Sequence, residues 1–297
     1  MEDDARKALA KIPFLAGYDG PLERLGGLTN TVYRAGDVVL RLPGQGTEEY
    51  INRADEKIAA EETARVGVSP EVLFVEPESG VMVTRYIENT TTMSPDGFRT
   101  TPGAPGRAGE AFRSLHMSGA RFAVQFKLFG MIEDYLSVLS TKDVDLPDGY
   151  HDVVAEAHKI RPLLEAAAPE PVACHCDPLC ENFLDTGTRM WIVDWEYAGM
   201  NDPMWDLGDL SVEGGFDEAQ DQELLEAYFG GPPDPADHGR MVVYKAMCDL
   251  LWTLWGLIQV ANDNPVEDFR AYADERFARC KSLMSRPDFA QHVSAIG

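Results

Sequence analysis

Along the first third of the chain, short hydrophobic runs are separated by turn-forming residues, and one longer stretch repeats its hydrophobic residues at helical spacing. Short runs rich in Val, Leu and aromatic residues and bounded by turns are typical of β-strands. Four runs show this pattern, in two pairs: 31–35, 38–42, 72–75 and 81–84. Residues 48–66 instead follow a helical period and end before Gly67, a common helix stop. Residues 1–88 therefore predict a small lobe of antiparallel sheet plus one helix, preceded by a helical leader.

The rest of the chain is mainly helical in pattern. Residues 88–109 are rich in Thr, Pro and Gly, which predicts a connector between lobes with little that can pack. Helical periods or strong helix formers then occupy residues 111–117, 126–139, 150–168, 220–229, 240–260 and 266–284. Only residues 174–195 read as strand and loop. The pattern predicts an α+β protein of two lobes, with residues 1–88 in the first and residues 89–297 in the second.

Composition adds a constraint on partners. The chain has 297 residues, of which 44% are hydrophobic, so it can bury a substantial core. Its 50 acidic and 26 basic residues give a net charge of −24, which disfavours nucleic acid and anionic lipid as partners. The same surface attracts small cations, although an acidic surface also serves solubility alone.

The cysteines and the apolar segments bear on localisation. Five cysteines are an odd number, and three of them, Cys174, Cys176 and Cys180, lie within seven residues of each other. The charged start of the chain lacks the apolar core of a secretory signal, so we expect a reduced, cytoplasmic protein. The most apolar stretch, residues 250–261, is shorter than the roughly 20 residues that span a bilayer, which predicts a buried helix and no membrane insertion.

The most specific motif interrupts the helical part. The run HCDPLCEN at residues 175–182 has the form H-x-D-x-x-x-x-N, and Asp194 follows shortly afterwards. In phosphoryl transfer such a first Asp orients the attacking hydroxyl, while the Asn and the second Asp hold Mg²⁺ through oxygen atoms. We therefore predict Asp177 as the catalytic residue, with Asn182 and Asp194 as metal ligands.

Local spacing supports this interpretation. Residues 183–184 and 189–193 can pair as a hairpin, which would bring Asn182 and Asp194 to the same end. Any one of these polar residues alone could be a turn former. A competing interpretation takes Cys174, His175, Cys176 and Cys180 as zinc ligands, but zinc sites usually use C-x2-C pairs.

The small lobe contains residues suited to phosphate binding. Gly26 and Gly27 precede the first predicted hairpin, where a backbone without Cβ atoms can approach phosphates. Arg41 lies within an apolar strand, where an inward-facing cation needs a partner, and Glu56 on the next helix can supply it. The alternative is that Arg41 faces solvent.

Taken together, the sequence resembles the choline/ethanolamine kinase family, within the wider aminoglycoside phosphotransferase and protein-kinase-like group. Four stretches carry the resemblance over nearly the whole chain: GGLTNTVYRA with VVLRLPG, HCDPLCENF, IVDWEYAGMNDPMWDLG, and LLWTLWGLIQ with YADERF. It implies a two-lobed protein-kinase-like fold, ATP as donor, Mg²⁺ as cofactor, and Asp177 as base. It also implies a nucleotide site made of Gly27, Asn30, Thr31, Arg41 and Glu56.

The resemblance further implies a site for a small cationic amino-alcohol. Trp252 and Trp255 share one helix face, and Tyr272 can close a third side, as in aromatic cages for quaternary ammonium. Without the resemblance, two tryptophans in an apolar helix are equally well explained as core. Glu196 is a candidate carboxylate near the cation, and Asp206 is expected to hydrogen-bond the catalytic-loop backbone.

The family usually has Gly or Asn where Cys176 stands, a departure that touches no predicted ligand. We therefore expect a choline or ethanolamine kinase. The alternatives are a relative acting on an aminoglycoside, thiamine or homoserine, or a non-catalytic nucleotide-binding module. The oligomeric state is not indicated.

Overall fold

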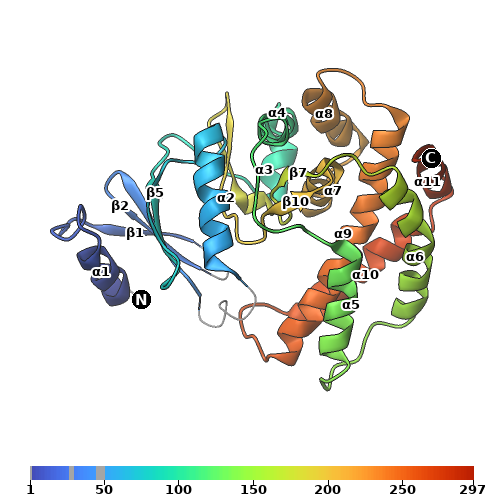
Figure 1. Ribbon diagram of the computed structural model, residues 1–297, viewed down its shortest axis with the longest axis horizontal. Coiled ribbons are helices and arrows are strands. Elements are labelled where there is room, and N and C mark those ends of the chain that lie inside the picture. The colour runs from blue at the N-terminus through green and yellow to red at the C-terminus, as the bar shows by residue number, and fades with distance from the viewer. Residues whose placement is uncertain (1, 27–29, 45–50) are drawn as a thin grey trace.

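The computed structural model describes residues 2–26, 30–44 and 51–297. A five-stranded antiparallel sheet forms the small lobe at one end of the molecule, in the order β1-β2-β3-β5-β4 (Figure 1). The strands are β1 (Leu22–Gly26), β2 (Thr31–Ala35), β3 (Val38–Leu42), β4 (Val72–Glu76) and β5 (Val81–Arg85). Both predicted hairpins are confirmed, because short apolar runs joined by local turns specify them without distant contacts.

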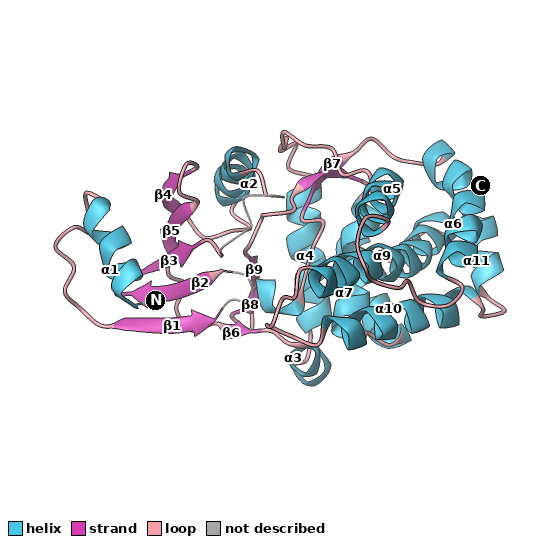
Figure 2. Cartoon of the chain, turned by 90° about the horizontal axis from the view of Figure 1, so that it is seen from below, coloured by secondary structure: helices cyan, strands magenta, loops and turns pink. Residues whose placement is uncertain are grey.

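The two faces of this sheet have different neighbours. Helix α1 (Glu2–Lys11) lies on the outer face, where Leu9 packs with Tyr33 and Leu40 (Figure 2). Helix α2 (Arg53–Val66) lies on the side of the second lobe, and Arg41 reaches its Glu56. Since side chains alternate along a strand, Leu40 and Arg41 necessarily point to opposite faces.

Residues 88–109 are not the unpacked connector that their composition predicts, so that prediction is wrong. They contain β6 (Thr91–Thr92), α3 (Pro95–Thr100) and the start of α4 (Ala104–His116), and Phe98 is only 1% exposed. Small residues allow close packing here: a Cβ atom on Gly109 would meet the Leu224 carbonyl oxygen at 2.4 Å. Tertiary contact thus overrides the low helix propensity of glycine.

The larger lobe is mainly helical, which confirms the predicted fold class. Its remaining helices are α5 (Leu128–Leu139), α6 (Tyr150–Ala166), α7 (Pro203–Gly214), α8 (Glu218–Phe229), α9 (Pro235–Ala261), α10 (Phe269–Met284) and α11 (Phe289–Ala295). Helix α9 is central and packs against α5, α7, α10 and α11. The sequence pattern did not predict α7, nor the short pair β7 (Val172–Cys174) and β10 (Gly199–Asn201).

Helix α9 has the length and apolar composition that a membrane-crossing helix would need, and among the described residues it alone does. However, 83% of its most apolar window is buried inside the protein. The predicted buried helix is therefore confirmed. The helix begins at Pro235, before the predicted residues 250–261, and its buried residues likewise begin earlier, at Gly239.

Candidate active site

The loop that carries Asp177 follows β7, and hydrogen bonds to helix α7 hold its backbone in place. Asp206 on that helix accepts hydrogen bonds from the backbone N–H groups of His175 at 2.7 Å and Cys176 at 2.8 Å. Asp206 is fully buried and also contacts His116 Nε2 at 3.1 Å. The predicted role of Asp206 is confirmed, and the loop is rigid because two consecutive backbone donors share one carboxylate.

His175 supports the loop from its other side. Its Nε2 lies 3.0 Å from the Val193 carbonyl oxygen, and its Nδ1 accepts a hydrogen bond from the Asp177 backbone N–H at 3.3 Å. The imidazole also packs against the Trp195 ring, with centroids 4.6 Å apart. His175 thereby ties the strand segment before Asp194 to the backbone of Asp177.

The cysteines of this region do not form the zinc site considered as an alternative. All five are buried and free, and burial raises the pKa of the Cys176 thiol well above its ordinary value. Among the described residues, the one metal-sized group that includes a cysteine joins Cys174 to His116 and Asp206. Both carboxylate oxygens of Asp206 already accept hydrogen bonds from the loop, so Cys174 is best explained as a packing residue.

Asn182 and Asp194 lie at one end of the hairpin, as predicted. Strand β8 (Phe183–Asp185) pairs with β9 (Met190–Ile192), and the Val193 N–H donates to the Asn182 carbonyl oxygen at 2.9 Å. The Asn182 side-chain amide donates to the Asp177 carbonyl oxygen at 3.3 Å, which leaves its own oxygen available. Register pairing thus brings three residues of the motif together although they are separated in sequence.

The donor set fits a hard cation such as Mg²⁺. Asp194 adopts a left-handed backbone conformation, with φ of 68°. One of its oxygens, Oδ1, is buried without a hydrogen-bond partner among the described residues, and Arg41 Nη1 lies 3.7 Å from it, beyond hydrogen-bond distance. A buried carboxylate oxygen without a donor favours further positive charge, and the amide oxygen of Asn182 suits the same ion.

The electrostatics of Asp177 and Asp194 also favour a bound cation. Burial, followed by the charges of Glu213 and Asp194, raises the pKa of Asp177 to about 8. Burial and the charge of Glu196 likewise raise the pKa of Asp194 to about 7. Negative charge is therefore concentrated here, and a cation placed among these groups lowers such pKa values again.

Two arginines of the small lobe face this region. Arg41 is buried and pairs with Glu56, with its Nη1 also 3.3 Å from Glu196 Oε1 and 3.7 Å from Asp194 Oδ1. Burial alone would lower the pKa of Arg41, but the hydrogen bond and charge of Glu56 raise it well above its ordinary value. The predicted strand-to-helix ion pair is formed, and the alternative of a solvent-facing Arg41 is wrong.

Sequence reasoning missed Arg53 and misplaced Glu196. Arg53 Nη1 lies 2.8 Å from Glu56 Oε2 and 2.5 Å from Glu196 Oε1, while the Asn30 amide donates to Glu196 Oε1 at 2.9 Å. Glu196 therefore belongs to the small-lobe ion network, and its assignment to the cationic substrate is corrected. Arg53 precedes Glu56 by one helical turn, a spacing that could have suggested the pair.

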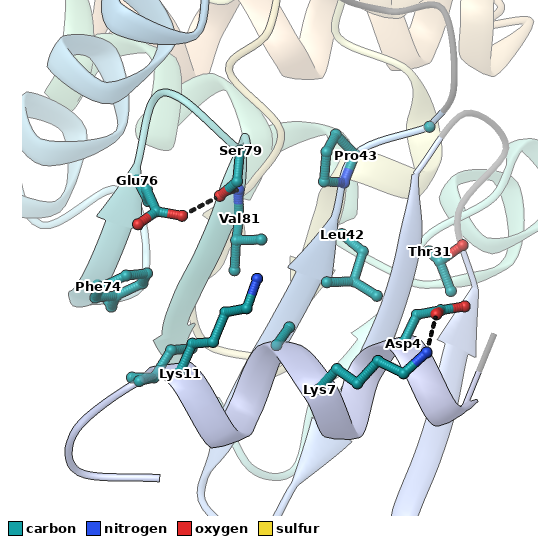
Figure 3. Close-up of a pocket in the computed structure, with 13 residues that line it drawn as sticks. Asp4, Lys7, Lys11, Thr31, Leu42, Pro43, Phe74, Glu76, Ser79 and Val81 are labelled. Atoms are coloured by element: carbon teal, nitrogen blue, oxygen red, sulfur yellow. Dashed lines mark hydrogen bonds and ion pairs between the residues drawn. The ribbon is translucent and has the colours of Figure 1, made fainter. Parts of the chain in front are cut away.

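Gly27 and Thr31 were also predicted to bind the nucleotide. Gly27 lies outside the described residues. Thr31 shares the outer face of the sheet with Tyr33, and it lines a cavity of about 560 Å³ between α1 and the strands (Figure 3). Its side chain therefore points away from Arg41, and its assignment with Arg41 and Glu56 is contradicted by the alternation of the strand. That cavity holds none of the predicted catalytic residues.

The predicted aromatic residues gather at the junction of α9 and α10, in two groups. Trp255 packs against Tyr272, with ring centroids 5.8 Å apart, and a Cβ atom on Gly256 would meet the Tyr272 ring at 2.7 Å. Trp252 is only 3% exposed; its ring lies 5.7 Å from that of Tyr197, and its Nε1 donates to Asp209 Oδ2 at 3.3 Å. Trp252 thus combines a core position with a polar contact.

Helix α7 contributes two carboxylates that the sequence analysis missed. Asp209 and Glu213 follow Asp206 by one and two helical turns and so lie on the same helix face. Asp209 is fully buried, and burial together with the charges of Glu213 and Asp177 raises its pKa well above the ordinary value. Its second oxygen, Oδ1, has no hydrogen-bond partner among the described residues.

A local signal for α7 was present in the sequence. Asp202 caps the helix by accepting from the Met204 N–H at 3.0 Å, and Pro203 occupies the first turn. Asp followed by Pro is a recognised helix start, and Gly215 supplies the stop. With that helix assigned, the spacing of its three acids would have directed attention to one acidic face beside Asp177.

These features define a phosphotransferase of the two-lobed, protein-kinase-like type. Residues 22–241 match the phosphotransferase enzyme family model, and because they make up most of the chain, the chain belongs to that family. Within it, the resemblance to choline/ethanolamine kinases is confirmed by solved structures. A choline/ethanolamine kinase family protein from Mesorhizobium loti is 68% identical, with a TM-score of 0.94 and 99% of this chain and 98% of that chain covered.

More distant solved structures agree. The choline kinase LicA from Streptococcus pneumoniae is 27% identical and has a TM-score of 0.80, with 96% of this chain and 99% of that chain covered. A LicA structure in complex with AMP is 26% identical, with a TM-score of 0.74 and 98% of each chain covered. The similarity therefore extends over both lobes.

Proposed function

We propose that this protein is a kinase that transfers the terminal phosphoryl group of ATP to the hydroxyl of choline or ethanolamine, with Mg²⁺ as cofactor. The observation that carries the proposal is the position of Asp177. Its backbone carbonyl oxygen accepts a hydrogen bond from the Asn182 amide at 3.3 Å on the predicted metal side, and burial with the charges of Glu213 and Asp194 raises the pKa of its carboxyl group. A residue between a metal-binding pair and a cation-attracting cluster is where an amino-alcohol hydroxyl meets a phosphate.

In this mechanism Asp177 orients the acceptor hydroxyl and takes its proton. The hydroxyl oxygen forms a bond to the γ-phosphorus, the bond from that phosphorus to the bridging oxygen breaks, and ADP leaves. Asp177 must be ionised to take that proton, and a cation held by Asn182 and Asp194 would lower its raised pKa of about 8 and so favour the ionised form. Mg²⁺, held by Asn182 and Asp194, would neutralise charge on the phosphate oxygens.

The small lobe supplies the remaining positive charge. Arg41 is held in place by Glu56 and faces the Asp194 carboxylate, so its guanidinium can contact phosphate oxygens on the donor side. The AMP complex of a LicA relative supports a nucleotide as the donor. The motif requires a nucleotide with a phosphoryl group to transfer, and the AMP complex favours ATP as that donor.

An acceptor with a positive charge is supported by the cluster opposite. Among the described residues, Asp209 has a buried oxygen without a donor, and its other oxygen accepts a hydrogen bond from Trp252. The Trp252 ring packs with Tyr197, and Trp255 packs with Tyr272 at the same helix junction. Aromatic faces and a carboxylate together favour an ammonium group. The relatives described as choline and choline/ethanolamine kinases support these two alcohols over the alternatives.

The localisation proposed from the sequence is the cytoplasm. It is supported by five cysteines that are all buried and unpaired.

The test measures ADP release with Mg-ATP over a panel of choline, ethanolamine, thiamine, homoserine and an aminoglycoside. We expect choline or ethanolamine to give the highest kcat/KM, and Asp177→Asn to lower kcat by at least about 1,000-fold. Turnover confined to another alcohol would replace the substrate assignment. No turnover above Asp177→Asn with any alcohol would leave the non-catalytic nucleotide-binding module as the better account.

A further inference from the structure

Arg276 on α10 lies beside the acceptor end of the proposed site. It is 4% exposed and pairs with Glu213 through Nη2, while its Nη1 lies 3.4 Å from Asp249 Oδ1 on α9. Its guanidinium carbon sits 4.4 Å from the centre of the Tyr272 ring. A cation over a ring face and beside a carboxylate is the same arrangement that would receive an ammonium ligand.

The charges around Arg276 come from three elements. Helix α7 contributes Asp209 and Glu213, helix α9 contributes Asp249, and helix α10 contributes a second cation, Arg279. Arg279 binds Asp249 through two contacts, at 3.1 and 2.6 Å, so Asp249 has its own counter-ion. Arg276 is then left to balance Glu213.

The count of charges leaves one carboxylate beside the rings without a counter-ion. Asp209 receives a hydrogen bond from Trp252, but no described cation bonds to it, and its Oδ1 is buried without a donor. Glu213 and Asp249 pair with Arg276 and Arg279, and Asp177 is committed to the acceptor hydroxyl in the proposed mechanism. Burial holds the pKa of Asp209 well above its ordinary value, and one added positive charge beside it would favour its ionised form. A second positive charge would lie beside Arg276 itself.

We propose that Arg276 is a specificity-determining residue: its guanidinium occupies one of two cation positions among the acids and rings, so the site accepts an alcohol with a single positive charge. This inference rests on the proposed kinase function. It predicts discrimination against alcohols with two or more charges, because a like charge placed beside a buried guanidinium is strongly disfavoured.

The experiment compares three acceptors that share a primary hydroxyl. The first two are choline and its neutral carbon analogue 3,3-dimethylbutan-1-ol. The third is a bis-quaternary analogue in which a 2-(trimethylammonio)ethyl group replaces one N-methyl group of choline. Permanent charges keep protonation out of the comparison. The wild-type protein should prefer choline, and Arg276→Met should shift the ratio of kcat/KM toward the doubly charged acceptor by about tenfold or more.

Two variants separate charge from structure. Arg276→Lys retains the cation and should keep the wild-type ratio. Arg270→Met removes a guanidinium of the same helix that pairs with Asp274 on the exposed surface, and it should also keep that ratio. An unchanged ratio in folded Arg276→Met, or an equal shift in Arg270→Met, would overturn the inference.

If Arg276→Met does not fold, Glu213→Gln tests the role of Arg276 instead. It leaves Arg276 without its main partner, so kcat/KM for choline should fall about tenfold while that for the neutral analogue changes little. Equal losses for both acceptors would contradict the inference. Wild-type turnover of choline separates this failure from failure of the proposed function, which would show as no turnover of any acceptor.

Discussion

Trp252 connects the aromatic and acidic parts of the acceptor end through one hydrogen bond, from Nε1 to Asp209 Oδ2 at 3.3 Å. Replacing it with Phe keeps a ring but leaves both Asp209 oxygens without donors. A hydrogen bond to a charged group contributes about 1.5–3 kcal/mol. We expect Trp252→Phe to raise the KM for choline or ethanolamine about tenfold and to leave the KM for ATP within about twofold.

The measurement is initial-rate kinetics with each substrate varied in turn. Trp191→Phe is the matched control, because that ring lies on β9 and packs under Arg189 at 3.8 Å rather than against the acids. If Trp252→Phe raised both KM values equally, Trp252 would be a core residue and not part of the acceptor end.

Cys176 is held in the left-handed region, with φ of 68°, by the two hydrogen bonds that Asp206 accepts from the loop. A side chain there costs about 1–2 kcal/mol, which glycine avoids. Cys176→Gly should therefore keep the melting temperature within about 3 °C of wild type, since lost strain offsets the lost thiol packing. Cys176→Val should lower it by about 5 °C or more, because branched side chains fit this region worst.

Differential scanning fluorimetry distinguishes these outcomes. Similar melting temperatures for the Gly and Val variants would show that the loop relaxes and that the backbone conformation is not enforced. The family preference for Gly or Asn at this position has the same explanation, which sequence inspection could note but not derive.

At the scale of elements, Arg107 joins α4 to the hairpin that carries Asn182 and Asp194. Its Nε and Nη2 lie 2.8 and 2.5 Å from the two oxygens of Asp185 on β8. Burial raises the pKa of Asp185, but the hydrogen bonds and charge of Arg107, with the Gly187 N–H, bring it below the ordinary value. The pair therefore stabilises the fold when Asp185 is ionised.

Arg107→Met should lower the free energy of unfolding by about 2 kcal/mol near pH 7, because it leaves a largely buried carboxylate unpaired. A depressed folded-state pKa gives stability that is present above the unfolded pKa of about 4 and is lost as the pH falls through the folded value. The difference between variant and wild type should thus shrink below about pH 4. Urea unfolding at several pH values measures this.

The control is Arg99→Met, because Arg99 pairs with Asp96 on the exposed surface of α3 and such pairs contribute little. An Arg107→Met effect that stayed constant with pH, or that matched Arg99→Met, would contradict the assigned role of the pair.

The elements also show where sequence reasoning succeeds. Strands β2 and β3 were predicted with their bounds because the two strand-forming runs and the turn at Gly36 are local signals. Helices α4 and α7 were missed in whole or in part because Gly109 and Gly208 weaken them locally. Both glycines pack against other helices so closely that a Cβ would come within 3 Å of a carbonyl oxygen. Such contacts exist only in the folded chain.

At the scale of the whole molecule, Glu196 links the lobes. It follows the metal-binding segment of the large lobe, and it pairs with Arg41 and Arg53 of the small lobe and accepts from Asn30. Since those partners lie on the donor side, Glu196→Gln should raise the KM for ATP about tenfold with little change in that for the acceptor.

The same kinetics on Glu88→Gln provide the control, because Glu88 meets Arg34 only through an exposed pair at 3.8 Å. A Glu196→Gln effect on the acceptor KM alone would restore the substrate role that the sequence suggested for Glu196.

The catalytic motif was predictable because its parts lie within twenty residues, and the hairpin register brings them together. The surroundings were not, because they depend on packing between distant segments. Thr31 was assigned from its neighbours in sequence, although strand alternation turns it to the outer face. Asp209 and Glu213 can be recognised as site residues only once α7 is known to lie near Asp177.

Phosphorus NMR of a reaction with Mg-ATP and choline or ethanolamine tests the central claim most directly. The account predicts that the γ-phosphate signal of ATP is replaced by that of a phosphomonoester of the alcohol, at a rate that Asp177→Asn abolishes while the variant remains folded. A phosphomonoester formed equally fast by Asp177→Asn, or inorganic phosphate as the sole product, would contradict it.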